Sequence, residues 1–216
     1  MFQQALNNRE QSGLVDGSHF EGYRLMNDKG PFDRKHLEKI VDVMQLALGE
    51  HPRTFAFRID LRLPSDWGTW DERRMIDRFI SSFKAKIMHS RDMAKRRSPS
   101  AHQTAIRYVW AREEGQGGRP HYHFVIFLNN DAFNNLGTYE LGRDNLFNRM
   151  TEAWASALGI TPDAAEGLVH IAKNAVYRIK AGDLHSQNEL FYRASYLAKD
   201  ATKVRGSRHC FGGSRG

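Results

Sequence analysis

Cysteine is almost absent from this sequence, since Cys210 is the one cysteine in 216 residues. A single cysteine excludes an intramolecular disulfide and a zinc site built from several thiolates, and it suits a reducing compartment such as the cytoplasm. The start of the chain lacks the basic residues and apolar run of a signal peptide. No apolar run approaches the roughly 20 residues that span a bilayer. We therefore expect a cytoplasmic protein with no membrane partner.

Acidic residues are too few to balance the basic ones. The chain has 32 Lys and Arg against 25 Asp and Glu, a formal net charge of +7. The excess is concentrated in residues 84–97 and 170–216. Such a distribution favours a polyanionic partner, above all nucleic acid, over the alternative of a solvated basic surface.

Apolar residues recur with the periods of short strands and amphipathic helices. Residues 1–32 are polar and aperiodic, which indicates a loose extension, and Asp33 can cap a helix over residues 33–48. From residue 51 onward the expected order is strand (54–63), helix (72 to about 97), strand (104–113), strand (120–128), helix (146–157), strand (167–173) and helix (186 to about 203).

The first six elements after residue 51 match the split β-α-β arrangement of ferredoxin-like folds. We therefore predict an α+β protein with an antiparallel sheet, helices on one face of it, an N-terminal helical extension, and an open second face. The predicted organisation is an extension (1–50), a main domain (51–204) and a basic, glycine-rich tail (205–216).

Two histidines stand two residues apart at the start of the third strand. His121 and His123 point to the same face of a strand, about 7 Å apart, and can converge on one metal ion. The alternative is a pair of hydrogen-bonded strand histidines, because ten histidines in this length make such a spacing frequent by chance. The residues around the pair must decide between the two.

Strand parity adds further polar groups to the histidine face. Glu113 lies across the predicted hairpin on that face, whereas Glu114 has the wrong parity unless a bulge intervenes. Two imidazoles and a carboxylate suit Mn²⁺ or Mg²⁺, or Zn²⁺. Asp60 and His170 share the parity and could hold the ligands from outside. The alternative for Glu113 is a solvated carboxylate.

The last predicted helix carries a stripe of tyrosines and lysines. Tyr192, Tyr196, Lys199 and Lys203 fall in one sector of it, opposite an apolar side that would dock on the protein. A tyrosine beside a metal-bound phosphodiester is a nucleophile arrangement, and a nearby lysine can stabilise the phenolate. The alternative is partly buried tyrosines covered by lysine side chains.

These residues together resemble the HUH endonucleases, which carry His-hydrophobic-His on a sheet and a tyrosine on a helix. More closely, the chain resembles the replication proteins of filamentous, inovirus-type phages and their prophage relatives, the YagK/YfjJ-type domain. The matching segments are Arg53 to Leu61, Trp110-Ala111-Arg112-Glu113, Pro120-His121-Tyr122-His123, Ala153 to Gly159, Ser195 to Lys199, and Phe211 to Arg215.

The resemblance implies an HUH palm in which His121, His123 and Glu113 bind Mg²⁺ or Mn²⁺ and Tyr196 attacks DNA. Tyr192 fits the two-tyrosine form of these enzymes, with Lys199 alongside. The product would be a 5′-phosphotyrosine that initiates rolling-circle replication in a bacterial host.

The implied partner is single-stranded DNA at a replication origin, with a host helicase and polymerase and no small-molecule cofactor. The residues expected to contact the DNA are Arg58, Arg62, Arg107, Lys203 and Arg205. Three alternatives stay open: a non-catalytic basic DNA-binding regulator, a single-strand DNA transposase or relaxase of the same superfamily, and a zinc hydrolase without covalent chemistry.

Overall fold

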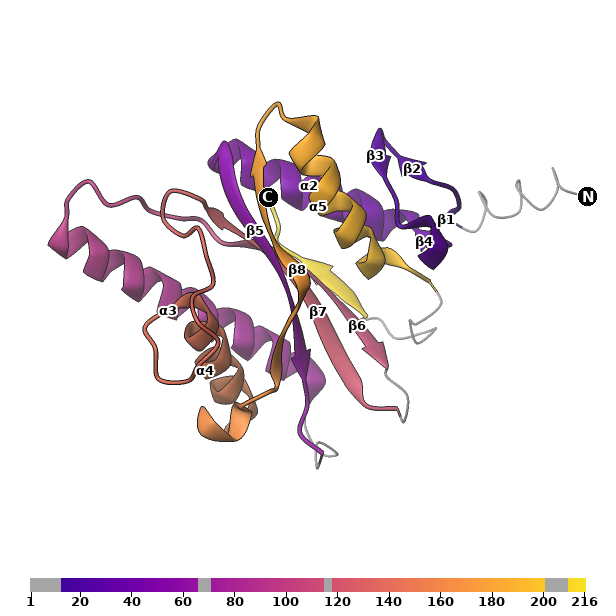
Figure 1. The fold of residues 1–216 in the computed structure, drawn as a ribbon. Helices are drawn as coiled ribbons and strands as arrows, with labels where there is room; N and C mark the ends of the chain where they lie inside the picture. The colour runs from indigo at the N-terminus through magenta and orange to yellow at the C-terminus, as the bar shows by residue number, and fades with distance from the viewer. Residues whose placement is uncertain (1–12, 66–70, 115–117, 201–209) are drawn as a thin grey trace, which may run out of the picture.

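A five-stranded antiparallel sheet forms the centre of the computed structural model, which describes residues 13–65, 71–114, 118–200 and 210–216 (Figure 1). The strand order is β8-β5-β7-β6-β9, and each strand is antiparallel to its neighbours. The strands are β5 (Arg53–Arg62), β6 (Arg107–Glu114), β7 (Pro120–Asn129), β8 (Val169–Lys180) and β9 (Phe211–Gly213). The molecule is thus of mixed α+β type, as predicted.

Helices α3 (Glu72–Arg97) and α4 (Leu146–Leu158) cover the first face of the sheet, and the 3-10 turn η2 (Asp163–Ala165) follows α4 (Figure 1). The alternating apolar residues of β5 and β7 point into this layer, where Phe79 of α3 packs edge-on against Phe124 and against the fully buried Trp154. The predicted parity of both strands is confirmed.

The second face of the sheet is not left open along its whole length, so the expectation of helices on one face is wrong. Helices α2 (Arg34–Glu50) and α5 (Leu184–Ala194) lie on this side (Figure 1). They cover an apolar half of the face, which consists of Ala56, Val109, Val125, Phe127 and Ile179. The polar half, beyond it along the strands, consists of Asp60, Arg62, Glu113, His121 and His123.

The apolar half explains why α2 is part of the main core and not an extension. Val125 and Phe127 follow the histidines with the same parity, and a strand that is apolar on both sides must be buried on both sides. Helix α2 supplies that cover with six buried apolar residues. It begins where expected, because the Asp33 carboxylate accepts a hydrogen bond from the His36 backbone N–H at 3.0 Å.

The N-terminal segment, defined here as residues 13–33, is folded, so the expectation of a loose extension is wrong for its described part. Strand β1 (Leu14–Val15) pairs with β4 (Phe32–Asp33), β2 (His19–Phe20) pairs with β3 (Tyr23–Arg24), and the turn η1 (Asn27–Lys29) lies between the pairs. Phe20, Tyr23 and Phe32 are buried in the same core as α2 and α5. Isolated aromatic residues without a period gave no signal of this burial.

The last helix ends earlier than expected. Helix α5 starts after Asp183, whose carboxylate accepts from the Ser186 N–H at 3.2 Å, and it ends at Ala194. A 3-10 turn, η3 (Ser195–Ala198), follows, and Lys199 is extended. The N-terminal segment explains the change. Phe32 forms an antiparallel β-bridge with Lys199, and the Asp200 N–H donates to the Pro31 carbonyl at 2.9 Å. Lys203 lies outside the described residues.

Two further strands differ from expectation. Strand β8 runs to Lys180, well past residue 173, because the chain resumes pairing after Asn174 turns at a φ of 55°. Strand β9, within the predicted tail, adds an edge to the sheet. There Gly212 lies against Trp110, and a Cβ at that glycine would stand 2.7 Å from the indole ring. None of the helices in the described ranges is both long and apolar enough to cross a membrane.

Candidate metal site and adjoining tyrosine

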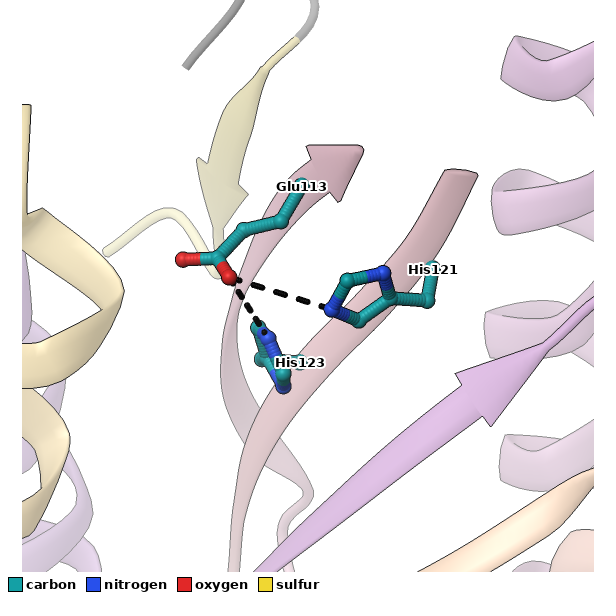
Figure 2. Close-up of side chains that lie close together, drawn as sticks. All are labelled: Glu113, His121 and His123. Carbon is teal, nitrogen blue, oxygen red and sulfur yellow. Dashed lines mark hydrogen bonds and ion pairs between the residues drawn. The ribbon is translucent and has the colours of Figure 1, made fainter. Parts of the chain in front are cut away.

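Three side chains from the hairpin β6–β7 converge in the polar half of the second face (Figure 2). The register places Glu113 directly opposite His121, and His123 follows on the same face. Glu113 Oε2 lies 3.1 Å from His123 Nε2 and 3.8 Å from His121 Nε2. The grouping expected from strand parity is therefore present. Glu114 points elsewhere and pairs with Arg112 at 3.0 Å.

The cluster could hold a metal ion. Its three ligand atoms all lie within 4.8 Å of one another, so one ion at the usual 2.0–2.2 Å from each donor can reach them with little movement. Glu113 and His123 are 2% and 4% exposed, whereas His121 is more open. Two imidazoles and one carboxylate leave coordination positions for water or substrate on the open side.

Asp60 on β5 holds His123 from behind, as the sequence suggested. Its Oδ1 lies 2.5 Å from His123 Nδ1, and its Oδ2 lies 3.5 Å from Nδ1 of His170 on β8. A proton on His123 Nδ1 directed at this carboxylate leaves Nε2 facing Glu113 and the cluster. Asp60 therefore orients the His123 ring so that Nε2 points toward the cluster.

The titration of these groups follows from their contacts. Burial raises the pKa of Asp60, but the hydrogen bond from His123 and the charges of His123, Arg58 and His170 outweigh it and lower that pKa to about 2. Burial opposes protonation of His123, yet the hydrogen bonds to Asp60 and Glu113 raise its pKa above the ordinary value. Burial and the neighbouring His123 lower the pKa of His121, which keeps that imidazole available as a ligand.

Tyr196 and Lys199, at the end of the α5–η3 segment, reach the cluster. The Tyr196 hydroxyl lies 3.3 Å from Glu113 Oε2 and 2.7 Å from Lys199 Nζ. Lys199 Nζ is also 3.6 Å from Glu113 Oε1. The tyrosine ring meets His123 edge-on at 5.5 Å between centroids, and the Arg58 guanidinium stacks on it at 4.8 Å. The two halves of the expected site therefore meet.

Tyr192 lies one turn before, in α5, and its described contacts are with other groups. Its ring packs against the core of α2 and the apolar half, and the Arg24 guanidinium lies 5.4 Å from its centroid. The helix ends between the two tyrosines, so they do not form the continuous stripe expected from helical periodicity. Tyr196 is the one of this pair that contacts the cluster within the described residues.

The residues expected to contact DNA fall into different surroundings. Arg58 is mostly buried in the site, 3.5 Å from Asp60. Arg62 is exposed next to His121. Arg107 lies farther along β6, where it pairs with Glu50 and donates to the Arg215 carbonyl. Lys203 and Arg205 lie outside the described residues.

Sequence reasoning missed what holds the tyrosine turn in place. The Ser195 hydroxyl donates to the Tyr192 carbonyl at 2.8 Å and accepts from the Met26 N–H at 3.2 Å. Asn188 accepts from the Arg24 N–H at 2.8 Å. The contacts to Met26 and Arg24 join residues more than 160 positions apart, and no local sequence pattern indicates them.

Comparisons with known proteins agree in one family. The family described as the YagK/YfjJ C-terminal domain matches residues 15–214. The protein named uncharacterized protein YfjJ, of Escherichia coli K12, is 32% identical over 214 residues, covering 93% of this chain and 97% of its own length. The uncharacterized protein YagK of the same organism is 31% identical over 183 residues, covering 80% and 88%. No solved structure matches this chain.

Proposed function

The chain belongs to the YagK/YfjJ C-terminal domain family, and we propose that it is a metal-dependent tyrosine endonuclease of the HUH type. In this proposal it nicks single-stranded DNA at a replication origin and initiates rolling-circle replication of a phage or prophage, as inovirus-type replication proteins do. The metal would be Mg²⁺ or Mn²⁺, held by Glu113, His121 and His123.

One observation carries the proposal: a tyrosine hydroxyl stands at a cluster that can hold a metal ion. Tyr196 reaches the carboxylate of Glu113 at 3.3 Å, with Lys199 at 2.7 Å from the same hydroxyl. Burial alone does not account for a phenol at this position, because its hydroxyl faces the one group of metal-ligating side chains found in the described residues. A nucleophile, a cation and potential metal ligands within reach of one phosphate support phosphoryl transfer.

The proposed reaction is a transesterification. The Tyr196 oxygen forms a bond to phosphorus while the bond from phosphorus to the 3′-oxygen breaks; the phenolic proton is given up to solvent, and the released 3′-oxygen takes up a proton. Lys199 stabilises the phenolate, and Arg58 fixes the ring by stacking. A divalent ion at the three ligands would neutralise charge on the phosphate oxygens. No phosphoester is lost, so the strand can be rejoined.

The arrangement of the sheet is consistent with this proposal. In chain order the main strands are β5, β6, β7 and β8, and in the sheet they lie in the order β8-β5-β7-β6. This is the order of a split β-α-β arrangement, and it supports the proposal of a ferredoxin-like HUH palm. We propose a cytoplasmic setting in a bacterial host, where a helicase and a polymerase supplied by the host would unwind and copy the DNA.

A denaturing gel with labelled single-stranded oligonucleotides tests the proposal directly. We expect a covalent protein–DNA adduct with Mn²⁺ or Mg²⁺ and none with EDTA. Tyr196→Phe should abolish it, and His121→Ala should weaken it severely. Tyr139→Phe, which removes the same hydroxyl from an exposed ring distant in sequence, is the matched control and should form the adduct normally.

Tyr192→Phe asks whether a second nucleophile exists. Because Tyr192 packs beside Arg24, we expect this variant to keep the first adduct. Full adduct formation by Tyr196→Phe would show that another residue is the nucleophile. Specific DNA binding that ignores both EDTA and the two tyrosines would instead favour a non-catalytic regulator.

A further inference from the structure

A recess adjoins the Glu113–His121–His123 cluster on the side away from Tyr196. It is an open pocket of about 750 Å³, a size typical of small-molecule sites. His121, His123 and Asp60 form the wall that it shares with the cluster. Its other walls come from the start of β7 and from the segment between η2 and β8.

The pocket and the tyrosine lie at opposite ends of the cluster along the strands. On β5, Arg58 stands opposite Val125, and Arg62 stands two residues farther along than Asp60, opposite His121. The Tyr196 ring stacks on Arg58, at the first of these positions. The pocket is lined by Arg62 and Leu63, at the other end. A phosphate held at the cluster would therefore have the tyrosine on one side and the pocket on the other.

The lining suits one unpaired nucleotide. Arg62 and Arg119 are exposed at the rim, and neither has an acidic partner among the described residues, unlike Arg58, Arg107 and Arg112, which do. Two free guanidinium groups are donors for phosphate oxygens. Leu168, which is partly exposed, offers apolar surface to a base, and the exposed Glu166 carboxylate can accept from a base amino group.

We propose that this pocket binds the nucleotide of single-stranded DNA that carries the leaving 3′-oxygen, with Arg62 and Arg119 on its phosphates. The orientation rests on the proposed function, because displacement at phosphorus is in line and the leaving oxygen departs on the side opposite the nucleophile. A base must be unpaired to enter, so the pocket selects single strands over duplex. Bound there, the released 3′ end stays beside the phosphotyrosine.

Binding without chemistry tests the pocket. Anisotropy of a fluorescein-labelled 12-nucleotide single strand of mixed sequence is measured in EDTA across a salt series, with the full chain. The variant Arg62→Ala/Arg119→Ala is compared with Arg53→Ala/Arg143→Ala, which removes the same charge from two highly exposed arginines that do not line the pocket.

The pocket variant should bind about tenfold or more weakly, because it loses two groups that donate charge-assisted hydrogen bonds to phosphate. Its salt slope should fall by about 1.4, or roughly 0.7 for each lost phosphate contact on a single strand. The control variant should change both quantities less. Equal losses in the two variants, or equal losses on single-stranded and duplex probes, would overturn the proposal.

Photo-cross-linking locates the DNA independently. An oligonucleotide that carries 4-thiothymidine should label peptides containing residues 118–123 or 166–170 in EDTA, and the pocket variant should lose this labelling. Labelling confined to other peptides would overturn the assignment. Neither measurement requires a nick, so a missing covalent adduct would refute the proposed activity while these results still decide whether DNA occupies the pocket.

Discussion

The apolar half and the polar half of the second sheet face are built by the same strands with the same side-chain parity, yet one is buried core and the other carries the candidate metal site. In the apolar half, Val125 and Phe127 lie under α2 and are at most 1% exposed. In the polar half, His121 and His123 take the same parity, and the His121 side chain is 27% exposed. The boundary runs at Arg58, where the ring of Tyr196 lies.

The comparison shows how a candidate metal site can adjoin an ordinary core on one face of a sheet. Burial of the apolar half anchors α2 and α5, and α5 leads into the turn that carries Tyr196 and Lys199. Helix α5 ends where this turn begins, so Tyr196 and Lys199 lie next to the polar half. The apolar half therefore provides the packing that holds the turn in place, and the polar half provides the groups that could hold a metal ion.

The largest effect that separates the halves should come from emptying the apolar one. Phe127→Ala removes a ring that is 1% exposed between the sheet and α2, and it should lower the free energy of unfolding by about 3–5 kcal/mol. Arg62→Ala, two strand positions from Asp60 in the polar half, should change it by no more than about 0.5 kcal/mol. Urea denaturation of both variants measures the contrast. Similar losses would mean that the two halves are not energetically distinct.

A smaller effect should appear in the polar half, on metal binding. Asp60→Asn keeps the size of the side chain but removes the charge that orients His123, so the affinity for Mn²⁺ should fall by about 10–100-fold, or about 1.4–2.7 kcal/mol. Calorimetric titration gives the affinity. His185→Ala, which removes a highly exposed imidazole from α5, is the control. An unchanged affinity would show that Asp60 has no part in holding the ligand.

The smallest effect should come from the joint between the N-terminal segment and α5. Asn188→Ala removes the acceptor for the Arg24 N–H at an exposed position, which should cost about 0.5–1 kcal/mol of unfolding free energy. Asn188→Asp retains an oxygen acceptor and should cost less. Hydrogen exchange of the Arg24 amide reports the same bond, and equal protection in both variants would mean that the side chain does not secure the segment.

Strand parity and hairpin register predicted the grouping of Glu113, His121 and His123, with Asp60 behind them. These inferences succeeded because the period of two and the pairing across a short turn are local properties of the sequence. The cap of α2 at Asp33 is equally local. The same reasoning used on the last helix failed after Ala194, because Phe32 and Pro31 pull the chain at Lys199 and Asp200 out of helical geometry.

The cover of the second face was missed for a different reason. Val125 and Phe127 carried a readable signal, since two large apolar residues on a supposedly open face require a partner. Nothing local identified that partner as α2, which precedes the sheet in the chain. Ser195 likewise gave no sign that it bonds Met26, because that contact exists only after the fold has formed. The prediction from sequence was therefore limited by contacts between residues far apart in the chain, and not by the chemistry of the side chains.

Three polar groups lie close to a single carboxylate oxygen of the site. Glu113 Oε2 accepts from the Tyr196 hydroxyl and faces the Nε2 atoms of both histidines. An ion bound there would compete with the Tyr196 hydroxyl for this oxygen. Because such coupling is reciprocal, the hydrogen bond from the hydroxyl lowers the affinity for the ion by the same factor. The Tyr196 hydroxyl would thus be restrained while no ion is bound and released when one binds, so the reactivity of this hydroxyl would depend on the ion.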